Sequence, residues 1–133
     1  MAPKKWLRNP VAREIELARA ELDLIDATRP DHALPHLRAA QDHLTTALDE
    51  AMAATILAKG ATIRSTGELA GLSENAVGPR LARTSLLGAY GDERVTATGV
   101  ERARYDLEEG RHRTPQPAAP SPTPSRFRAR RPN

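Results

Sequence analysis

The sequence predicts a mainly α-helical fold in which an N-terminal helical hairpin is followed by shorter helices and a disordered C-terminal tail. Its 133 residues match a single domain, because domains cluster at about 100 to 150 residues. Only 3% of the residues are aromatic, and a core of small aliphatic side chains suits packed helices better than a β-sandwich. Apolar residues also recur at helical spacing through the first 60 positions.

The first helix is expected to run from Asn9-Pro10 to about Thr28. Asn can cap the free amides of a helix start, and Pro at the first position lacks only a donor that would stay unbonded. The acidic residues of this helix are interpreted as a solvated face, or as one partner of a basic surface elsewhere. Its apolar residues recur every three or four positions and should face a partner: Val11, Ile15, Ala18, Leu22 and Ile25.

The second helix is expected to be long and to end at Gly60, which can adopt the left-handed conformation that closes helices. The turn at Arg29–Asp31 separates it from the first helix, since a residue before proline is pushed out of helical geometry. Asp31 is expected to cap it. Its apolar positions are Leu34, Leu37, Leu44, Leu48, Met52 and Ile56. Residues 10–60 are therefore predicted to form an α-hairpin, which we expect to serve dimerisation.

Two short helical segments are expected next, on either side of a turn at residues 70–73. Gly71 permits the tight turn, Leu72 can fill the angle between the helices, and Ser73 can cap the second one. Beyond Tyr90, the segment GDE followed by RVTAT predicts a turn and a short strand of a hairpin. Thr98 and Glu101 have capping-box spacing and predict a last helix closed by Gly110.

The segment ATIRSTGELAGLSENAVGPRLA resembles the helix-turn-helix of bacterial transcription regulators. Gly71 stands at the turn, with Gly67 four residues before it, Leu72 after it and Val77 inward on the second helix. The following LLGAYGDERVTATGVERA is similar to the strand, wing and helix of multiple-antibiotic-resistance-type regulators. The resemblance covers about residues 44–109. It implies a winged helix-turn-helix at 44–110 that shares the long helix.

The resemblance further implies that the second helix of the motif lies in the major groove of double-stranded DNA. The residues at or near the start of that helix, expected to approach base edges, are Ser73, Glu74, Asn75 and Arg80. The residues whose types suit phosphate contacts are Arg64, Arg83 and Thr84. Arg94 would reach the minor groove or the backbone from the wing. The function implied is that of a homodimeric transcription regulator.

Pro79 departs from the motif, because proline in a helix interior costs about 3 kcal/mol and opposes the carbonyl of Asn75. Either the second helix kinks at Pro79, or it begins there with only a turn before it. The second alternative would remove Glu74 and Asn75 from a groove-reading helix but leave Arg80 and Arg83 available.

The positive charge is concentrated at the two ends of the chain, although the formal total is only +3. Residues 1–9 form a basic arm. Residues 111–133 are rich in proline and arginine and are predicted to be disordered. We favour a nucleic-acid arm over a polyproline ligand or a solubilising tail, and its candidate DNA-binding residues are Arg126, Arg128, Arg130 and Arg131.

Several other classes of function find no support in the sequence. The absence of cysteine excludes disulfides, thiolate zinc sites and thiol nucleophiles. His32 and His36 lie one helical turn apart, with His43 and Asp42 nearby, but such a pair without a third ligand on a second element is more often a solvated face than a metal site. No phosphate-binding glycine loop or nucleophile elbow is present. We therefore expect no enzyme, cofactor or metal, no membrane association, and a location in the bacterial cytoplasm, on the nucleoid when DNA is bound.

Two alternative functions remain open from the sequence alone, a remote one being a metal-dependent helical enzyme, which elemental analysis would test, and the main one being an adaptor. The protein would then be a non-enzymatic helical adaptor of a phage, a plasmid or the cell-division machinery, and its basic Pro-rich tail would dock a protein partner. Binding of DNA by residues 1–110 would distinguish a regulator from such an adaptor.

Overall fold

The computed structural model describes residues 9–114. Two predicted segments lie outside this range: the tail arginines from Arg126 onward, and the basic arm at 1–9 apart from the backbone of residue 9. Within it the fold is mainly α-helical, as predicted, and no strand is formed. The elements are α1 (Asn9–Asp23), α2 (Pro30–Lys59), α3 (Ile63–Ala70), α4 (Glu74–Leu81), the 3₁₀ turn η3 (Gly88–Tyr90) and α5 (Ala97–Glu108).

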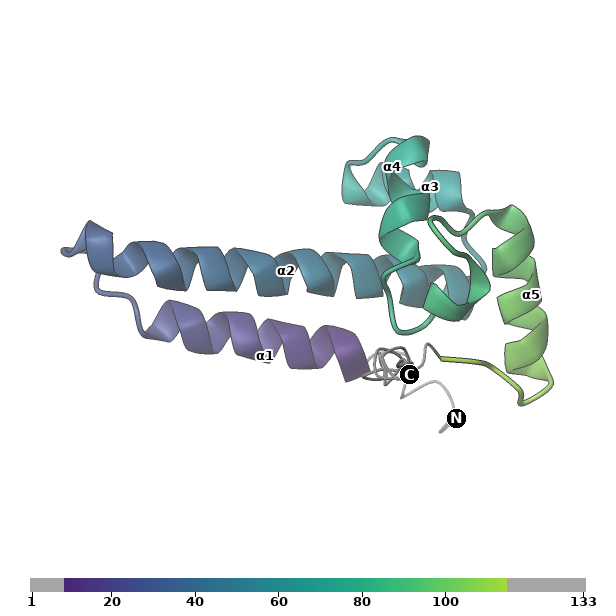
Figure 1. Ribbon diagram of the computed structural model, residues 1–133, viewed down its shortest axis with the longest axis horizontal. Coiled ribbons are helices and arrows are strands. Elements are labelled where there is room, and N and C mark those ends of the chain that lie inside the picture. The colour runs from purple at the N-terminus through teal and green to yellow at the C-terminus, as the bar shows by residue number, and fades with distance from the viewer. Residues whose placement is uncertain (1–8, 115–133) are drawn as a thin grey trace, which may run out of the picture.

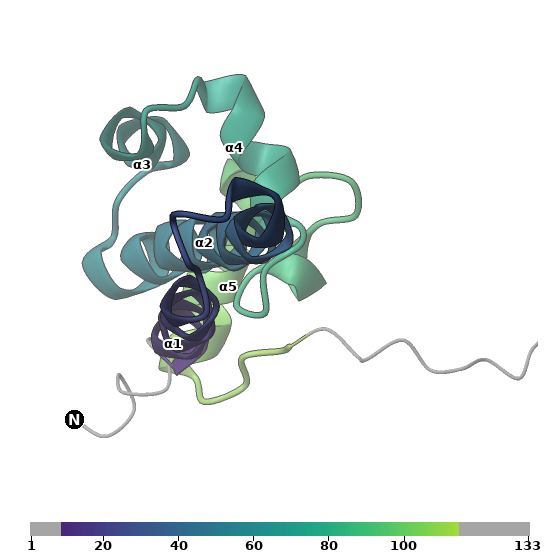
Figure 2. The ribbon, with the colours of Figure 1, turned by 90° about the vertical axis from the view of Figure 1, so that its left-hand side faces the viewer.

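The helices are arranged around the 30-residue helix α2 (Figure 1). α1 runs back along the N-terminal part of α2, and this hairpin extends away from the shorter helices. α3 and α4 lie beside the C-terminal part of α2, on the side opposite to α1 (Figure 2). α5 crosses near the end of α2. None of the helices between residues 9 and 114 is both long and apolar enough to cross a membrane.

Small residues and two polar pairs hold the hairpin together. Ala18 of α1 is buried, and the buried residues of the N-terminal part of α2 are Ala33, Ala40 and Ala47. Nδ1 of His43 donates to Glu14 Oε1 at 2.7 Å, and Nδ1 of His36 donates to Glu21 Oε1 at 2.8 Å. Glu14 and Glu21 are partly buried, so the interpretation of all the α1 acids as a solvated face is wrong for these two.

The predicted boundaries between α1 and α2 need two corrections. α1 ends at Asp23, five residues before Thr28, and Asp26 Oδ1 then accepts from the backbone N and the hydroxyl of Thr28. Such local side-chain bonds compete with helix formation. α2 begins at Pro30 with Arg29 at its N-cap, so Asp31 lies in the first turn and is not the cap. Gly60 closes α2 as predicted, with φ of 71°.

One apolar core joins the C-terminal part of α2 to the shorter helices. Its most deeply buried members are Ala53, Ile56, Val77, Leu81, Leu86, Leu87, Val95 and Ala103. Arg104 of α5 fastens the end of α2, because Nη2 donates to Ile56 O at 3.2 Å and to Ala61 O at 2.6 Å. A cation at this position also opposes the negative end of the helix dipole.

The predicted wing strand is absent from the described residues. Residues 91–96 form an irregular loop instead, and Val95 N donates to Gly78 O at 3.0 Å. The capping-box prediction is also wrong, because α5 begins at Ala97 with Thr96 as its N-cap, which places Thr98 inside the first turn. The predicted closure at Gly110 is confirmed by its φ of 74°.

The predicted start of the disordered tail, residue 111, is too early. Arg113 N donates to the Tyr90 hydroxyl at 2.8 Å, and Nε2 of His112 donates to Leu86 O at 2.7 Å. The Tyr90 hydroxyl in turn donates to the buried carboxylate of Asp106 at 2.9 Å. Residues 111–114 therefore belong to the folded part of the chain.

Candidate nucleic-acid interface

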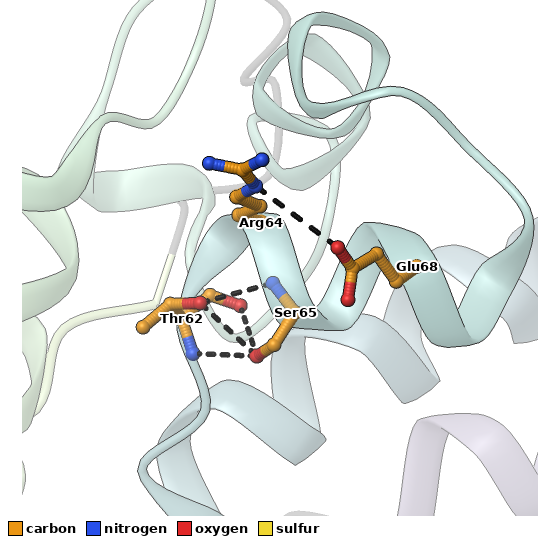
Figure 3. Close-up of polar contacts among 4 residues, drawn as sticks. All are labelled: Thr62, Arg64, Ser65 and Glu68. Atoms are coloured by element: carbon orange, nitrogen blue, oxygen red, sulfur yellow. Dashed lines mark hydrogen bonds and ion pairs between the residues drawn. The ribbon is translucent and has the colours of Figure 1, made fainter.

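Helix α3 begins with a reciprocal cap that the sequence analysis did not identify (Figure 3). Thr62 Oγ1 accepts from Ser65 N at 2.9 Å, and Ser65 Oγ accepts from Thr62 N at 3.1 Å. Serine takes the place that Glu or Gln has in the usual capping box, which is why the pattern is hard to recognise. Arg64 follows the cap with a side chain 76% exposed, and its Nε lies 4.0 Å from Glu68 Oε2.

The tight turn between α3 and α4 forms as predicted around Gly71, which has φ of 76°. Leu72 N donates to Gly67 O at 2.8 Å and Gly71 N donates to Glu68 O at 3.3 Å, a pair of bonds that satisfies the last carbonyls of α3. A Cβ on Gly67 would lie 2.9 Å from Leu72 O and 3.0 Å from Val77 Cγ2. Glycine at position 67 therefore allows α3 and α4 to approach closely.

Helix α4 runs from Glu74 through Pro79 to Leu81. The alternative in which it begins at Pro79 is therefore wrong. Proline has no N–H to donate to Asn75 O, the acceptor one turn earlier, and Nη2 of Arg94 donates to that oxygen at 3.3 Å instead. The loop before α5 thus replaces the bond that Pro79 cannot make.

A surface hollow of about 270 Å³ lies where the starts of α3, α4 and α5 meet. The residues that line it are Thr62, Ile63, Arg64, Glu74, Asn75, Gly78, Arg94, Val95, Thr96 and Ala97. Arg64, Glu74, Asn75 and Arg94, four of the candidate residues, are therefore brought together and are exposed. Ser73 stands beside them at the N-cap of α4, exposed and without a side-chain capping bond.

Two other candidates are engaged within the fold. Arg80 points toward α2, where its Nε donates to Asp49 Oδ1 at 2.6 Å and its side chain is only 22% exposed. Thr84 is 1% exposed; its hydroxyl donates to Leu81 O and accepts from Leu87 N. The expectation that Thr84 contacts phosphate is wrong because it is buried, and Arg80 is held away from the outer face of α4.

The outer face of α4, together with the turn just after the helix, carries three exposed residues at four-residue spacing. Asn75, Pro79 and Arg83 are exposed, whereas Val77, Gly78 and Leu81 are buried against the core. Arg83 keeps 65% of its side chain exposed although Nη2 lies 3.5 Å from Asp49 Oδ2. Pro79, which the sequence marks only as a residue unfavourable in a helix interior, is also part of this face.

The side of α4 toward α2 is acidic. A second hollow, of about 320 Å³, is lined by Asp42, Thr45, Thr46, Asp49, Glu50 and Arg83. Burial raises the pKa of Glu50 above its ordinary value, and the bonds from Ser85 N and Oγ to this carboxylate oppose the shift. Two buried carboxylates oppose phosphate binding inside this hollow, and Arg83, which also lines it, keeps most of its side chain exposed.

Comparisons with known proteins do not identify the chain. No family model matches it, and no curated protein or solved structure is significantly similar. Functional inference therefore rests on the pattern of the α3–α4 segment and on the described geometry.

Proposed function

We propose that this protein is a non-catalytic, DNA-binding transcription regulator whose α3–α4 unit acts as a helix-turn-helix. In this proposal α4 enters the major groove of duplex DNA and the neighbouring arginines contact phosphates. The protein acts as a homodimer in the bacterial cytoplasm. The resemblance in the α3–α4 segment and the exposure of the outer face of α4 support this proposal together.

The observation that carries the proposal is that Asn75 and Pro79 point outward on a helix whose other side is buried, with the exposed Arg83 just beyond its end. Asn can pair with the N6 and N7 atoms of adenine through two hydrogen bonds, and apolar atoms can contact the thymine methyl. Asn75 and Pro79 supply these two kinds of contact, and Glu74 can accept from cytosine. Arg83, beyond the end of α4, is placed for the backbone.

Phosphate contacts are assigned to three exposed arginines, Arg64, Arg83 and Arg94. Each phosphate neutralised by a cation lowers the slope of log affinity against log salt by about 0.9. The described residues of one protomer would thus contribute a slope of about −3. The predicted tail arginines would make the slope of the full chain steeper without adding sequence preference.

A fluorescence titration with duplex DNA tests these assignments. The double substitution Arg64→Ala and Arg83→Ala should weaken binding at least tenfold and make the salt slope less negative by about two for each protomer bound. Arg19→Ala on α1 is the control, because Arg19 is similarly exposed, at 71%, and pairs only with its helix neighbour Glu16. Unchanged affinity in the double variant would refute the assignments.

Arg80 provides a second, independent comparison. Because its guanidinium is bound to Asp49, Arg80→Met should change DNA affinity less than twofold in a folded variant. If Arg80→Met weakened binding as strongly as the Arg64 and Arg83 double variant, the ion pair would have to open on DNA and the assigned face of α4 would be incorrect.

Chain truncation separates the regulator from the helical adaptor with a docking tail. Residues 1–114 include every described residue and should bind DNA with a sequence preference. If DNA retained the full chain but not residues 1–114, binding would be assigned to the tail and the adaptor would be favoured.

A further inference from the structure

The hairpin carries an apolar surface that no described residue covers. Four leucines on α2 are exposed, and we call them the leucine face. Their exposed fractions are 64% for Leu34, 47% for Leu37, 49% for Leu44 and 37% for Leu48. Spacings of three, seven and four residues place them on one side of a helix. Exposed apolar surfaces of this extent commonly mark interaction sites.

The polar pairs of the hairpin show on which flank the leucine face lies. His36 and His43 bond to α1 on one side of the buried Ala40. Leu37 and Leu44 each follow a histidine by one residue, which is about 100° around the helix. The leucines therefore lie on the flank opposite to the histidines.

Helix α1 adds to the same flank by the same rule. Ile15 and Leu22 each follow one of the paired glutamates, Glu14 and Glu21, by one residue. Because α1 and α2 are antiparallel, their side chains one step beyond the polar pairs fall on the same flank of the hairpin. Leu22 is 45% exposed. The apolar surface thus extends over both helices of the hairpin, as expected for half of a four-helix bundle.

The leucine face nearly repeats itself when its direction is reversed. The exposed residue Gln41 stands seven positions after Leu34 and seven before Leu48, and it lies between Leu37 and Leu44. A two-fold interface places the same patch of both subunits in contact. Reversal about Gln41 sets Leu34 against Leu48 and brings Leu37 within one residue of the position opposite Leu44, and it lets two Gln41 amides exchange hydrogen bonds at the centre.

We propose that a second copy of this chain covers the leucine face in antiparallel orientation, with Gln41 at the two-fold axis. From Leu34 to Leu48 the face is about 21 Å long, and two adjacent helices are about 20 Å wide, so each protomer would contribute about 420 Å² and the pair would bury roughly 800 Å². This area is at the weak end of specific interfaces, which agrees with a dimer that forms at micromolar concentration.

The arrangement also specifies where the DNA-binding units lie, a consequence that rests on the proposed function. The shorter helices join α2 between Asp49 and Ile56, which are 8 and 15 residues beyond Gln41. At 1.5 Å per residue, the two attachment regions lie about 24 to 45 Å apart along the bundle. This interval includes the roughly 34 Å of one DNA turn that separates half-sites.

Disulfide trapping tests the orientation, because the natural chain has no cysteine. Under copper-phenanthroline oxidation without DNA, full-length Gln41→Cys should form a covalent dimer, since helices packed 8 to 10 Å apart bring facing Cα atoms within about 6 Å. Leu34→Cys and Leu48→Cys should cross-link when mixed and not when oxidised separately. Leu17→Cys is the control and should not cross-link. Leu17 is as exposed as Leu48, at 37%, but lies on the histidine flank of the hairpin.

Cross-linking of Leu34→Cys to itself, or none at position 41, would overturn the antiparallel arrangement. Sedimentation gives a second test: the wild type should be a dimer at micromolar concentration, and Leu37→Glu with Leu44→Glu should weaken association at least 100-fold, whereas Leu17→Glu should not. A wild-type monomer at high micromolar concentration would refute the proposal. If that monomer still bound DNA with sequence preference, only the dimer would be lost and the DNA-binding proposal would stand.

Discussion

Replacing Pro79 by alanine should stabilise this protein, the reverse of what most substitutions do. Pro79 is exposed inside α4, so alanine removes no buried contact and restores an N–H for Asn75 O. Proline is about 3 kcal/mol less favourable than alanine in a helix interior.

Two effects reduce the gain. Arg94 already donates to Asn75 O, and this hydrogen bond contributes about 0.5 to 1.5 kcal/mol. Proline also lowers the conformational entropy of the unfolded chain, which stabilises the folded protein by about 0.4 to 1 kcal/mol. We therefore expect the free energy of unfolding to rise by about 1 kcal/mol. In urea this raises the midpoint by about 0.3 to 1 M at an unchanged m value.

A double-mutant cycle isolates the part of Arg94 in this account. Arg94→Met keeps the aliphatic stem and removes the donor, so it should cost about 1 kcal/mol in the wild type and almost nothing beside Pro79→Ala. Arg64→Met is the control and should cost under about 0.5 kcal/mol, because its ion pair is exposed. Equal costs of Arg94→Met in both backgrounds, or destabilisation by Pro79→Ala, would refute the reasoning.

Three further substitutions probe the folded unit, each by urea unfolding. Burial raises the pKa of Glu50, so the folded state binds the carboxyl proton of Glu50 more tightly than the unfolded state does. The stability contributed by Glu50 therefore falls as pH rises above about 4.5, and Glu50→Gln should remove this fall. An identical pH profile of stability in wild type and variant would contradict the raised pKa. Gly67→Ala should lower the free energy of unfolding by about 1 to 3 kcal/mol through the contacts with Leu72 O and Val77, whereas a gain in stability would show that α3 and α4 can separate freely. Tyr90→Phe should lower the free energy of unfolding by about 1 to 3 kcal/mol and speed proteolysis at residues 111–114, because Asp106 and Arg113 N lose their shared hydroxyl. Unchanged proteolysis would show that Tyr90 does not hold residues 111–114 against the fold.

Helix ends governed by local backbone geometry could be predicted from the sequence. Gly60, Gly71 and Gly110 all have positive φ, and each one ends a helix where the pattern of apolar residues ends. The boundary between α1 and α2 was harder, because the apolar spacing continues past Asp23 while the Asp26 side chain forms a local turn. That competition depends on hydrogen bonds that periodicity does not describe.

The packing of the hairpin was not predictable from apolar spacing alone. The leucines of α2 have the stronger pattern, yet the small Ala33, Ala40 and Ala47 face α1. Small side chains let two helices approach closely, and the two histidine–glutamate pairs then determine the rotation of α2. Neither effect gives a strong signal in one helix considered by itself.

The candidate site was predicted in part. The turn at Gly71 and the inward Val77 follow from local pattern, and Arg64, Asn75 and Arg94 are exposed as expected. The partners of Arg80 and Thr84 come from α2 and from the loop after α4, so their burial depends on tertiary packing. Asp49 lies 31 residues from Arg80 and resembles a solvated helix residue in the sequence.

The most direct test of the central claim is selection of bound duplexes from a random DNA pool by the full-length wild type and by Asn75→Ala. The account predicts that the wild type enriches a palindromic sequence and that Asn75→Ala loses the preference for adenine at one position of each half-site. Enrichment of no sequence by the wild type, or of the same sequence by both proteins, would contradict base recognition by the outer face of α4.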